Sequence, residues 1–83
     1  MLNIDVKFVA RELTPGLENT AFATESGTTI RHLIELIAEQ NGVSIPENNF
    51  ARLYPMFNGK PVAISNALTQ DGTLHVCRVA MGG

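Results

Sequence analysis

The sequence predicts an α+β fold, a mixed sheet of four to five strands with one helix packed on one face. Apolar residues alternate with polar ones near both ends of the chain, as is typical of half-buried strands. Between them, one apolar stripe repeats with the period of an amphipathic helix. Because the chain has 83 residues, these elements form one domain with one modest core.

The first 24 residues predict a hairpin. Residues 2–8 alternate, with Leu2, Ile4, Val6 and Phe8 on one face and Asn3, Asp5 and Lys7 on the other. Thr14-Pro15-Gly16 is a turn signal, because proline presets φ and glycine accepts a positive φ. A weaker strand is expected over residues 19–24.

One helix is predicted within residues 28–42. Its apolar stripe consists of Ile30, Leu33, Ile34 and Ile37. Thr28 or Thr29 can cap its first turn by accepting a hydrogen bond from a free N–H. Asn41-Gly42 supplies the left-handed residue that ends it. Arg31, Glu35 and Glu39 are expected to face water.

The second half predicts a polar connection and three further strands. Residues 43–50 read as the connection, and Asn58-Gly59 predicts a tight hairpin between apolar runs. Pro55 cannot donate to a ladder, so its strand is edge-like there or begins after it. Asp71-Gly72 reads as a turn before a last strand over residues 73–79, in which Leu74 and Val76 face one way and His75 and Cys77 the other.

Composition excludes several function classes. The formal net charge is −2 and no two basic residues are adjacent, so nucleic acid is not an expected partner. No apolar stretch approaches the length of a membrane span, and the alternating, charged N-terminus does not resemble a signal peptide. Cys77 is the only cysteine, which suits a reducing compartment, and we expect a cytoplasmic protein with no membrane partner.

No internal catalytic set is visible in the sequence. It contains no glycine-rich phosphate loop, no paired-cysteine metal motif and no nucleophile elbow. His32 and His75 read as surface histidines, and Cys77 reads as a small half-buried hydrophobe. Glu35 and Glu39, one helical turn apart, read as a solvated face. We therefore expect no enzyme activity in this chain, and no metal or cofactor bound by it.

The closing residues, Arg-Val-Ala-Met-Gly-Gly, leave two interpretations. A frayed terminus or terminal linker is one. The other is a terminus whose α-carboxylate reacts in the active site of a partner protein. Glycine lets the backbone approach closely, and an extended Ala-Met-Gly-Gly spans about 13 Å, enough to thread a narrow channel. We expect a folded domain over residues 1–79 and a flexible C-terminal tail over residues 80–83.

Five segments together resemble one family. They occur in the order VKFVARELTPG, GTTIRHLIELIAEQNG, FNGKPV, LTQDGTLHV and a closing GG. This arrangement resembles the ubiquitin-like β-grasp sulfur carriers, namely the small subunit of molybdopterin synthase and the sulfur carrier of thiamine biosynthesis. The closing TLHVCRVAMGG also resembles the end of ubiquitin. The sequence departs from these relatives at Thr73, where molybdopterin-type carriers often have aspartate, and at Ala80-Met81, where ubiquitin has basic residues and those carriers often have prolines.

The resemblance implies a carrier or co-substrate rather than an enzyme. Gly83 would be adenylated by an activating enzyme that uses ATP and magnesium, and Gly82 would give that enzyme access. A sulfur donor would then convert the adenylate to a thiocarboxylate for cofactor biosynthesis, and a large synthase subunit is a possible further partner. The partner-binding residues would be Arg78, Val79, Ala80 and Met81 along the partner's channel, with His75 and Cys77 on a docking surface.

Two alternatives remain open at this point. The chain can be a ubiquitin-like modifier that is joined through Gly83 to lysines of target proteins. It can also be an interaction module without an activated terminus. This fold accommodates all three functions, so the fold alone does not choose among them.

Overall fold

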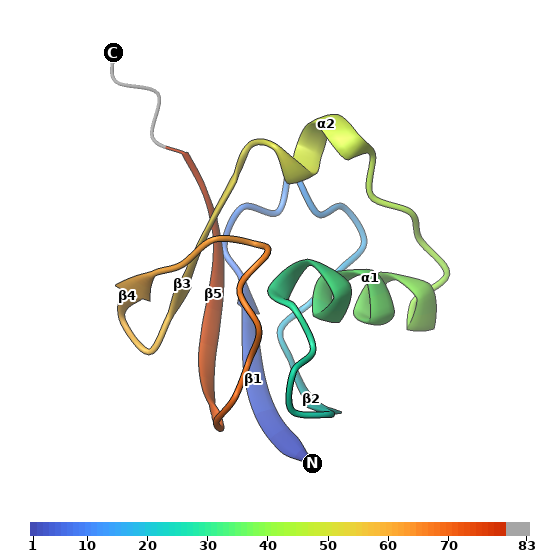
Figure 1. Cartoon of the computed structure of the whole chain (residues 1–83). Coiled ribbons are helices and arrows are strands. Elements are labelled where there is room, and N and C mark those ends of the chain that lie inside the picture. The colour runs from blue at the N-terminus through green and yellow to red at the C-terminus, as the bar shows by residue number, and fades with distance from the viewer. Residues whose placement is uncertain (80–83) are drawn as a thin grey trace.

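The first and last strands of the chain lie side by side in the centre of one sheet (Figure 1). In the computed structural model, which describes residues 1–79, β1 (Leu2–Phe8) pairs in parallel with β5 (Gly72–Arg78). The strand order is β2-β1-β5-β3-β4, and the other pairings are antiparallel. The predicted mixed sheet is therefore confirmed, with five strands.

Two hairpins flank this central pair. β2 (Thr20–Thr24) returns along β1, so the predicted N-terminal hairpin is confirmed. β3 (Leu53–Phe57) and the short β4 (Lys60–Pro61) are joined at Asn58 and Gly59, whose φ values are 50° and 83°. Two consecutive positive φ values are typical of the tight hairpin turn that Asn-Gly predicts.

Pro55 lies within β3, which is not an edge strand. The Val62 N–H donates to the Pro55 carbonyl, so the backbone groups of Pro55 face the side on which β4 lies. Because β4 is only two residues long, few backbone hydrogen bonds join β3 to the strand on this side. The proline is therefore tolerated on the side where a donor is least needed.

The predicted helix is α1 (Ile30–Gln40), and it covers one face of the sheet (Figure 1). Thr29 caps it, because its hydroxyl oxygen accepts a hydrogen bond from the His32 N–H at 3.1 Å. Gly42, at φ 70°, follows the last turn as predicted. The buried side chains of α1 are Ile30, Leu33, Ile34, Ile37 and Ala38.

The polar connection predicted over residues 43–50 contains an element that the sequence did not predict. This segment contains a second, short helix, α2 (Glu47–Phe50), and Phe50 is only 4% exposed. The Arg31 guanidinium lies 4.4 Å from the centre of the Phe50 ring and also pairs with Glu47. Burial of one aromatic ring against α1 therefore organises a segment whose sequence is mostly polar.

The prediction of a turn at Asp71-Gly72 also needs correction. Gly72 is the first residue of β5, and Asp71 Oδ1 accepts a hydrogen bond from the Asn3 N–H at 2.9 Å. A Cβ at Gly72 would lie 2.5 Å from Asn58 Oδ1 and 2.6 Å from Phe57 Cζ. Glycine is required here because the tip of the β3–β4 hairpin packs against the strand.

The sheet has two unlike faces. The face toward α1 carries the fully buried side chains of β1 and β5, namely Ile4, Val6, Leu74 and Val76. The opposite face, which we call the open face, is not covered by any described element (Figure 1). The alternation predicted for the last strand is confirmed, since His75 and Cys77 lie on the open face and are half-buried.

Candidate functional site: the tail exit and the open face

The chain leaves the sheet at the end of β5. This strand ends at Arg78, and the Val79 N–H donates to the Arg52 carbonyl at 3.0 Å. That hydrogen bond aligns the last described residue with the segment between α2 and β3. The last described residue therefore lies at the end of the molecule where α2 lies (Figure 1).

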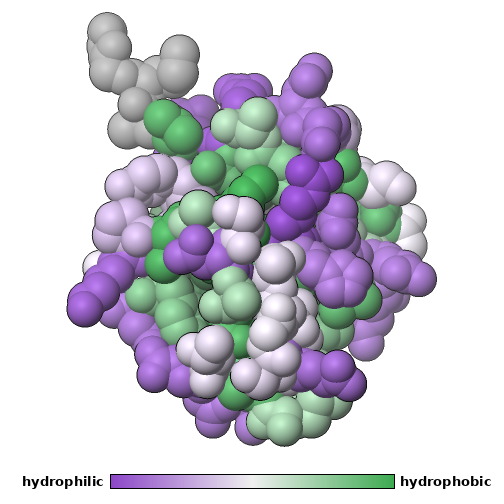
Figure 2. Space-filling model, viewed as in Figure 1, coloured by the Kyte–Doolittle hydropathy of each residue, from purple (hydrophilic) through white to green (hydrophobic). Residues whose placement is uncertain are grey.

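Two arginines flank this point. Ala51, Arg52, Arg78 and Val79 line a hollow of about 220 Å³, which we call the tail exit. Val79 is 44% exposed there, and Figure 2 shows hydrophobic surface where the described chain ends. The tail exit thus combines an exposed apolar side chain with two long cationic ones.

The arginines of the tail exit are weakly neutralised. Arg78 Nη1 lies 3.5 Å from Glu12 Oε1, and both side chains are more than half exposed, so this pair adds little stability. Within residues 1–79, Arg52 forms no ion pair. The chain carries a net charge of −2, yet its exit presents positive charge. An acidic partner surface would be attracted to this end of the molecule.

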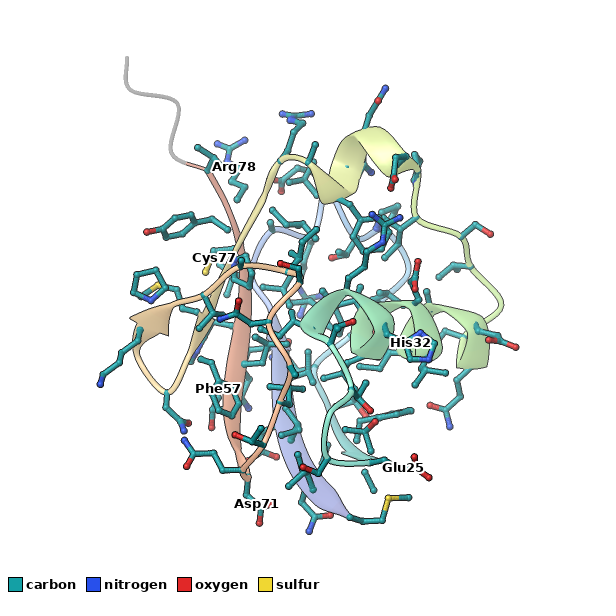
Figure 3. The ribbon with its side chains drawn as sticks, viewed as in Figure 1. Glu25, His32, Phe57, Asp71, Cys77 and Arg78 are labelled. Carbon is teal, nitrogen blue, oxygen red and sulfur yellow. The ribbon has the colours of Figure 1, made fainter. Side chains whose placement is uncertain are left out.

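The open face brings together side chains from two strands. Tyr54 of β3 lies opposite Cys77, and Met56 lies opposite His75. Figure 3 shows Cys77 on the side of β5 away from α1, one residue before the labelled Arg78. Tyr54 is 45% exposed, so an apolar surface of the open face adjoins the tail exit.

Three neighbours of the predicted site were not indicated by the sequence, namely Arg52, Tyr54 and Met56. Their position depends on the register of β3 against β5, which pairs Leu53 with Arg78. Nothing local in the sequence specifies that register. In β3, buried Leu53 and Pro55 alternate with Tyr54 and Met56. This alternation could have predicted which side chains of β3 lie on the outer face of the sheet, but not which strand pairs with β3.

The predicted site residues separate into three groups. Arg78 and Val79 lie at the tail exit, and His75 and Cys77 lie on the open face. Ala80, Met81, Gly82 and Gly83 lie outside the described residues, and their roles stay predictions. His32 lies on α1, with Nδ1 3.5 Å from Glu35 Oε1, and is no part of this site.

Neither a cluster of metal ligands nor a membrane-spanning helix is found in the part of the chain that the structure describes. Among residues 1–79, no three His, Cys, Asp or Glu side chains are grouped to hold a metal ion. No helix in this part of the chain is long and apolar enough to cross a membrane. The hydrogen bond to Glu47 and, to a lesser extent, the one to Glu35 raise the pKa of the Arg31 guanidinium. The pair of Arg31 with Glu47 joins α1 to α2.

Comparison with known proteins identifies the fold. No family model and no curated protein matches the sequence. Subunit 1 of a molybdopterin converting factor from Pyrococcus furiosus superposes with a TM-score of 0.63 at 20% identity, covering 94% of this chain and 98% of that one.

Two structures of small archaeal modifier protein 1 from Haloferax volcanii are also similar. The first has a TM-score of 0.64 at 13% identity and covers 98% of this chain and 99% of the other. The second has a TM-score of 0.65 at 11% identity, with coverage of 94% and 98%. With its five-stranded mixed sheet and α1 on one face, this chain therefore has the ubiquitin-like β-grasp fold.

Proposed function

We propose that this chain is a sulfur carrier for cofactor biosynthesis whose reactive group is the carboxyl of Gly83. The observation that carries the proposal is the tail exit. The central strand β5 ends there at Arg78, beside Arg52, and the residues that follow Val79 in the sequence are Ala-Met-Gly-Gly. The similarity in fold to a molybdopterin converting factor subunit supports it.

The proposed chemistry takes place in a partner's active site. A carboxylate oxygen of Gly83 attacks the α-phosphate of ATP, pyrophosphate leaves, and an acyl adenylate forms. Hydrosulfide supplied by a sulfur donor then attacks the glycine carbonyl carbon, the bond to AMP breaks, a proton is lost, and the new C–S bond leaves Gly83 as a thiocarboxylate. Magnesium assists by neutralising the charge of the triphosphate in the activating enzyme.

In this proposal the chain acts as a co-substrate. Its partners are an adenylating enzyme, a sulfur donor and the large subunit of a synthase, all in the cytoplasm. The arginines of the tail exit attract an acidic rim around the partner's channel, and the open face around His75 and Cys77 packs against its surface. Molybdopterin or thiamine synthesis would consume the sulfur.

Intact mass spectrometry tests the proposal. The protein is purified from its native host, where its partner enzymes are present, and compared with a variant that lacks Gly82 and Gly83. We expect part of the full chain to carry one sulfur in place of one oxygen, and none of the variant to do so. If the full chain never carries this replacement, the sulfur-carrier proposal fails.

The second candidate is a protein modifier, and the similarity in fold to small archaeal modifier protein 1 favours it. This function predicts amide conjugates between Gly83 and target lysines, which disappear when Gly82 and Gly83 are deleted. Chains of modifiers would have to use Lys7 or Lys60, the only two lysines. Trypsin cuts after Arg78, so detection of a Val-Ala-Met-Gly-Gly remnant on lysines of digested host proteins separates this outcome from sulfur transfer.

A further inference from the structure

The outer edge strand β2 has a sequence that reads the same in both directions. Its residues are Thr20-Ala21-Phe22-Ala23-Thr24, with Phe22 at the centre. β2 stands first in the strand order and pairs within the sheet only with β1. It contains no charge and no proline, which are the common protections of an exposed edge. β2 is therefore available as a template for another strand.

Hydrogen bonds at the two ends of β1 show which of its residues face β2. The Phe8 N–H donates to Asn19 Oδ1, next to the start of β2, at 2.9 Å. The Asn3 N–H donates instead to Asp71 Oδ1, next to the start of β5. Because successive residues of a strand direct their backbone groups to opposite sides, the even-numbered residues of β1 face β2.

The same alternation leaves two residues of β2 facing outward. Ile4 lies opposite Phe22, so Phe22 directs its N–H and C=O toward β1. Ala21 and Ala23 then direct theirs away from the sheet. Both alanine side chains are exposed, and the Ala21 carbonyl accepts a hydrogen bond from the neighbouring Thr20 hydroxyl at 3.3 Å, which leaves its second lone pair for another donor.

We propose that β2 pairs antiparallel with β2 of a second copy of this chain, about a two-fold axis through Phe22. In this register Ala21 of each copy lies opposite Ala23 of the other. The outward N–H and C=O groups of these alanines then satisfy one another across the axis. The two sheets become one continuous sheet, and the interface is isologous.

Side chains on both sides of the axis fit this register. The two Phe22 residues form a non-hydrogen-bonded pair, in which cross-strand side chains lie closest, and each ring is only half-buried in the single copy. Thr20 lies opposite Thr24, and such threonine pairs are favourable. Just beyond the ends of β2, Glu25 of one copy lies opposite the uncharged Asn19 of the other. The proposed register therefore places no two like charges opposite each other across the axis.

The dimer leaves the proposed sulfur-carrier function unobstructed. β2 lies at one edge of the sheet, whereas the chain leaves the domain at the opposite end of the molecule from it (Figure 1). A pair of five-residue strands buries less surface than the roughly 1,200 Å² typical of stable complexes. Association is therefore weak and depends on concentration.

Two charge variants that differ at one position test the register. Ala21→Lys with Ala23→Lys places like charges opposite each other across the axis, whereas Ala21→Lys with Ala23→Asp places opposite charges there. In both, Lys at position 21 lies beside Asp5 of β1. Sedimentation equilibrium from micromolar to millimolar protein should show a wild-type dimer. Its dissociation constant should be about tenfold or more higher in the first variant than in the second. A wild type that stays monomeric throughout this range, or variants that associate equally, would overturn the proposal.

Disulfide trapping provides an independent test. In a Cys77→Ser background, Phe22→Cys brings two thiols together at the axis and should give a covalent dimer in a glutathione redox buffer. Thr20→Cys is the matched control. Its thiol lies opposite Thr24 of the other copy, about 13 Å along the strand from the second introduced thiol. Equal cross-linking of the two variants would also overturn the proposed register.

Discussion

At Gly72, the backbone of β5 passes against the tip of the β3–β4 hairpin. Gly72→Ala would place a methyl group within 2.6 Å of both the Phe57 ring and the Asn58 amide. Neither neighbour moves freely, because Phe57 packs against the core and Asn58 Oδ1 accepts the Thr73 N–H. We expect Gly72→Ala to lower the free energy of unfolding by about 1–3 kcal/mol, measured by urea denaturation.

A double variant identifies the cause of this loss. Asn58 has a φ of 50°, which glycine adopts without strain, so Asn58→Gly removes the obstructing amide at a compatible position. Gly72→Ala should therefore cost less in the Asn58→Gly background than in the wild type. Additive losses would show that the approach of the hairpin is not what requires glycine.

Arg52 is the residue through which charge at the tail exit can be tested. If a partner threads the residues after Val79, Arg52→Glu reverses a charge at the rim of that contact. We expect kcat/KM for adenylation to fall about tenfold, mainly through slower association. ATP–pyrophosphate exchange with the host's activating enzyme measures this. Lys60→Glu, the same charge change on β4, is the control and should leave the rate unchanged.

Among the helices and strands, the features that the sequence predicted correctly are those that depend on contacts between residues close in sequence. The cap of α1, the stop at Asn41-Gly42 and the hairpin turn at Asn58-Gly59 are set by residues adjacent in sequence. The helix α2 was missed because its stability comes from a distant contact. Phe50 is buried under Arg31, and a four-residue helix has no apolar period of its own.

The cap of α1 yields a prediction at this scale. Thr29→Ala leaves the His32 N–H without its hydrogen bond in the first turn. The free energy of unfolding should fall by about 1 kcal/mol. Thr69→Ala, at an exposed threonine outside the helices and strands, is the matched control and should change the stability little. Equal losses in both variants would contradict the capping role.

For the whole molecule, the sequence predicted the elements but not their order in the sheet. Alternation identified β1 and β5 as half-buried strands, yet nothing in either indicates that they pair in parallel. That pairing joins Val6 to Leu74 across nearly the whole chain, and the register of β3 on β5 depends on it. The antiparallel pairing of β3 with β5 assembles the candidate site, since its register, with Leu53 opposite Arg78, brings Arg52 beside Arg78. Residues 75–79 were predicted from the alternating strand and the family resemblance, whereas their neighbours from β3 required the three-dimensional structure.

Two truncations test whether the fold and the proposed reactive end are separable. A chain that ends after Val79 retains all of β5 and the hydrogen bond from Val79 to Arg52. It should unfold in urea at the same midpoint as the full chain. A chain that ends after His75 lacks Val76, which is fully buried and whose carbonyl accepts the N–H groups of Val9 and Ala10. Because β5 is the central strand, this second chain should show no cooperative unfolding by circular dichroism. A lower midpoint for the first truncation would mean that residues 80–83 contribute to the folded domain, and their proposed role as a threaded substrate would have to include release from it.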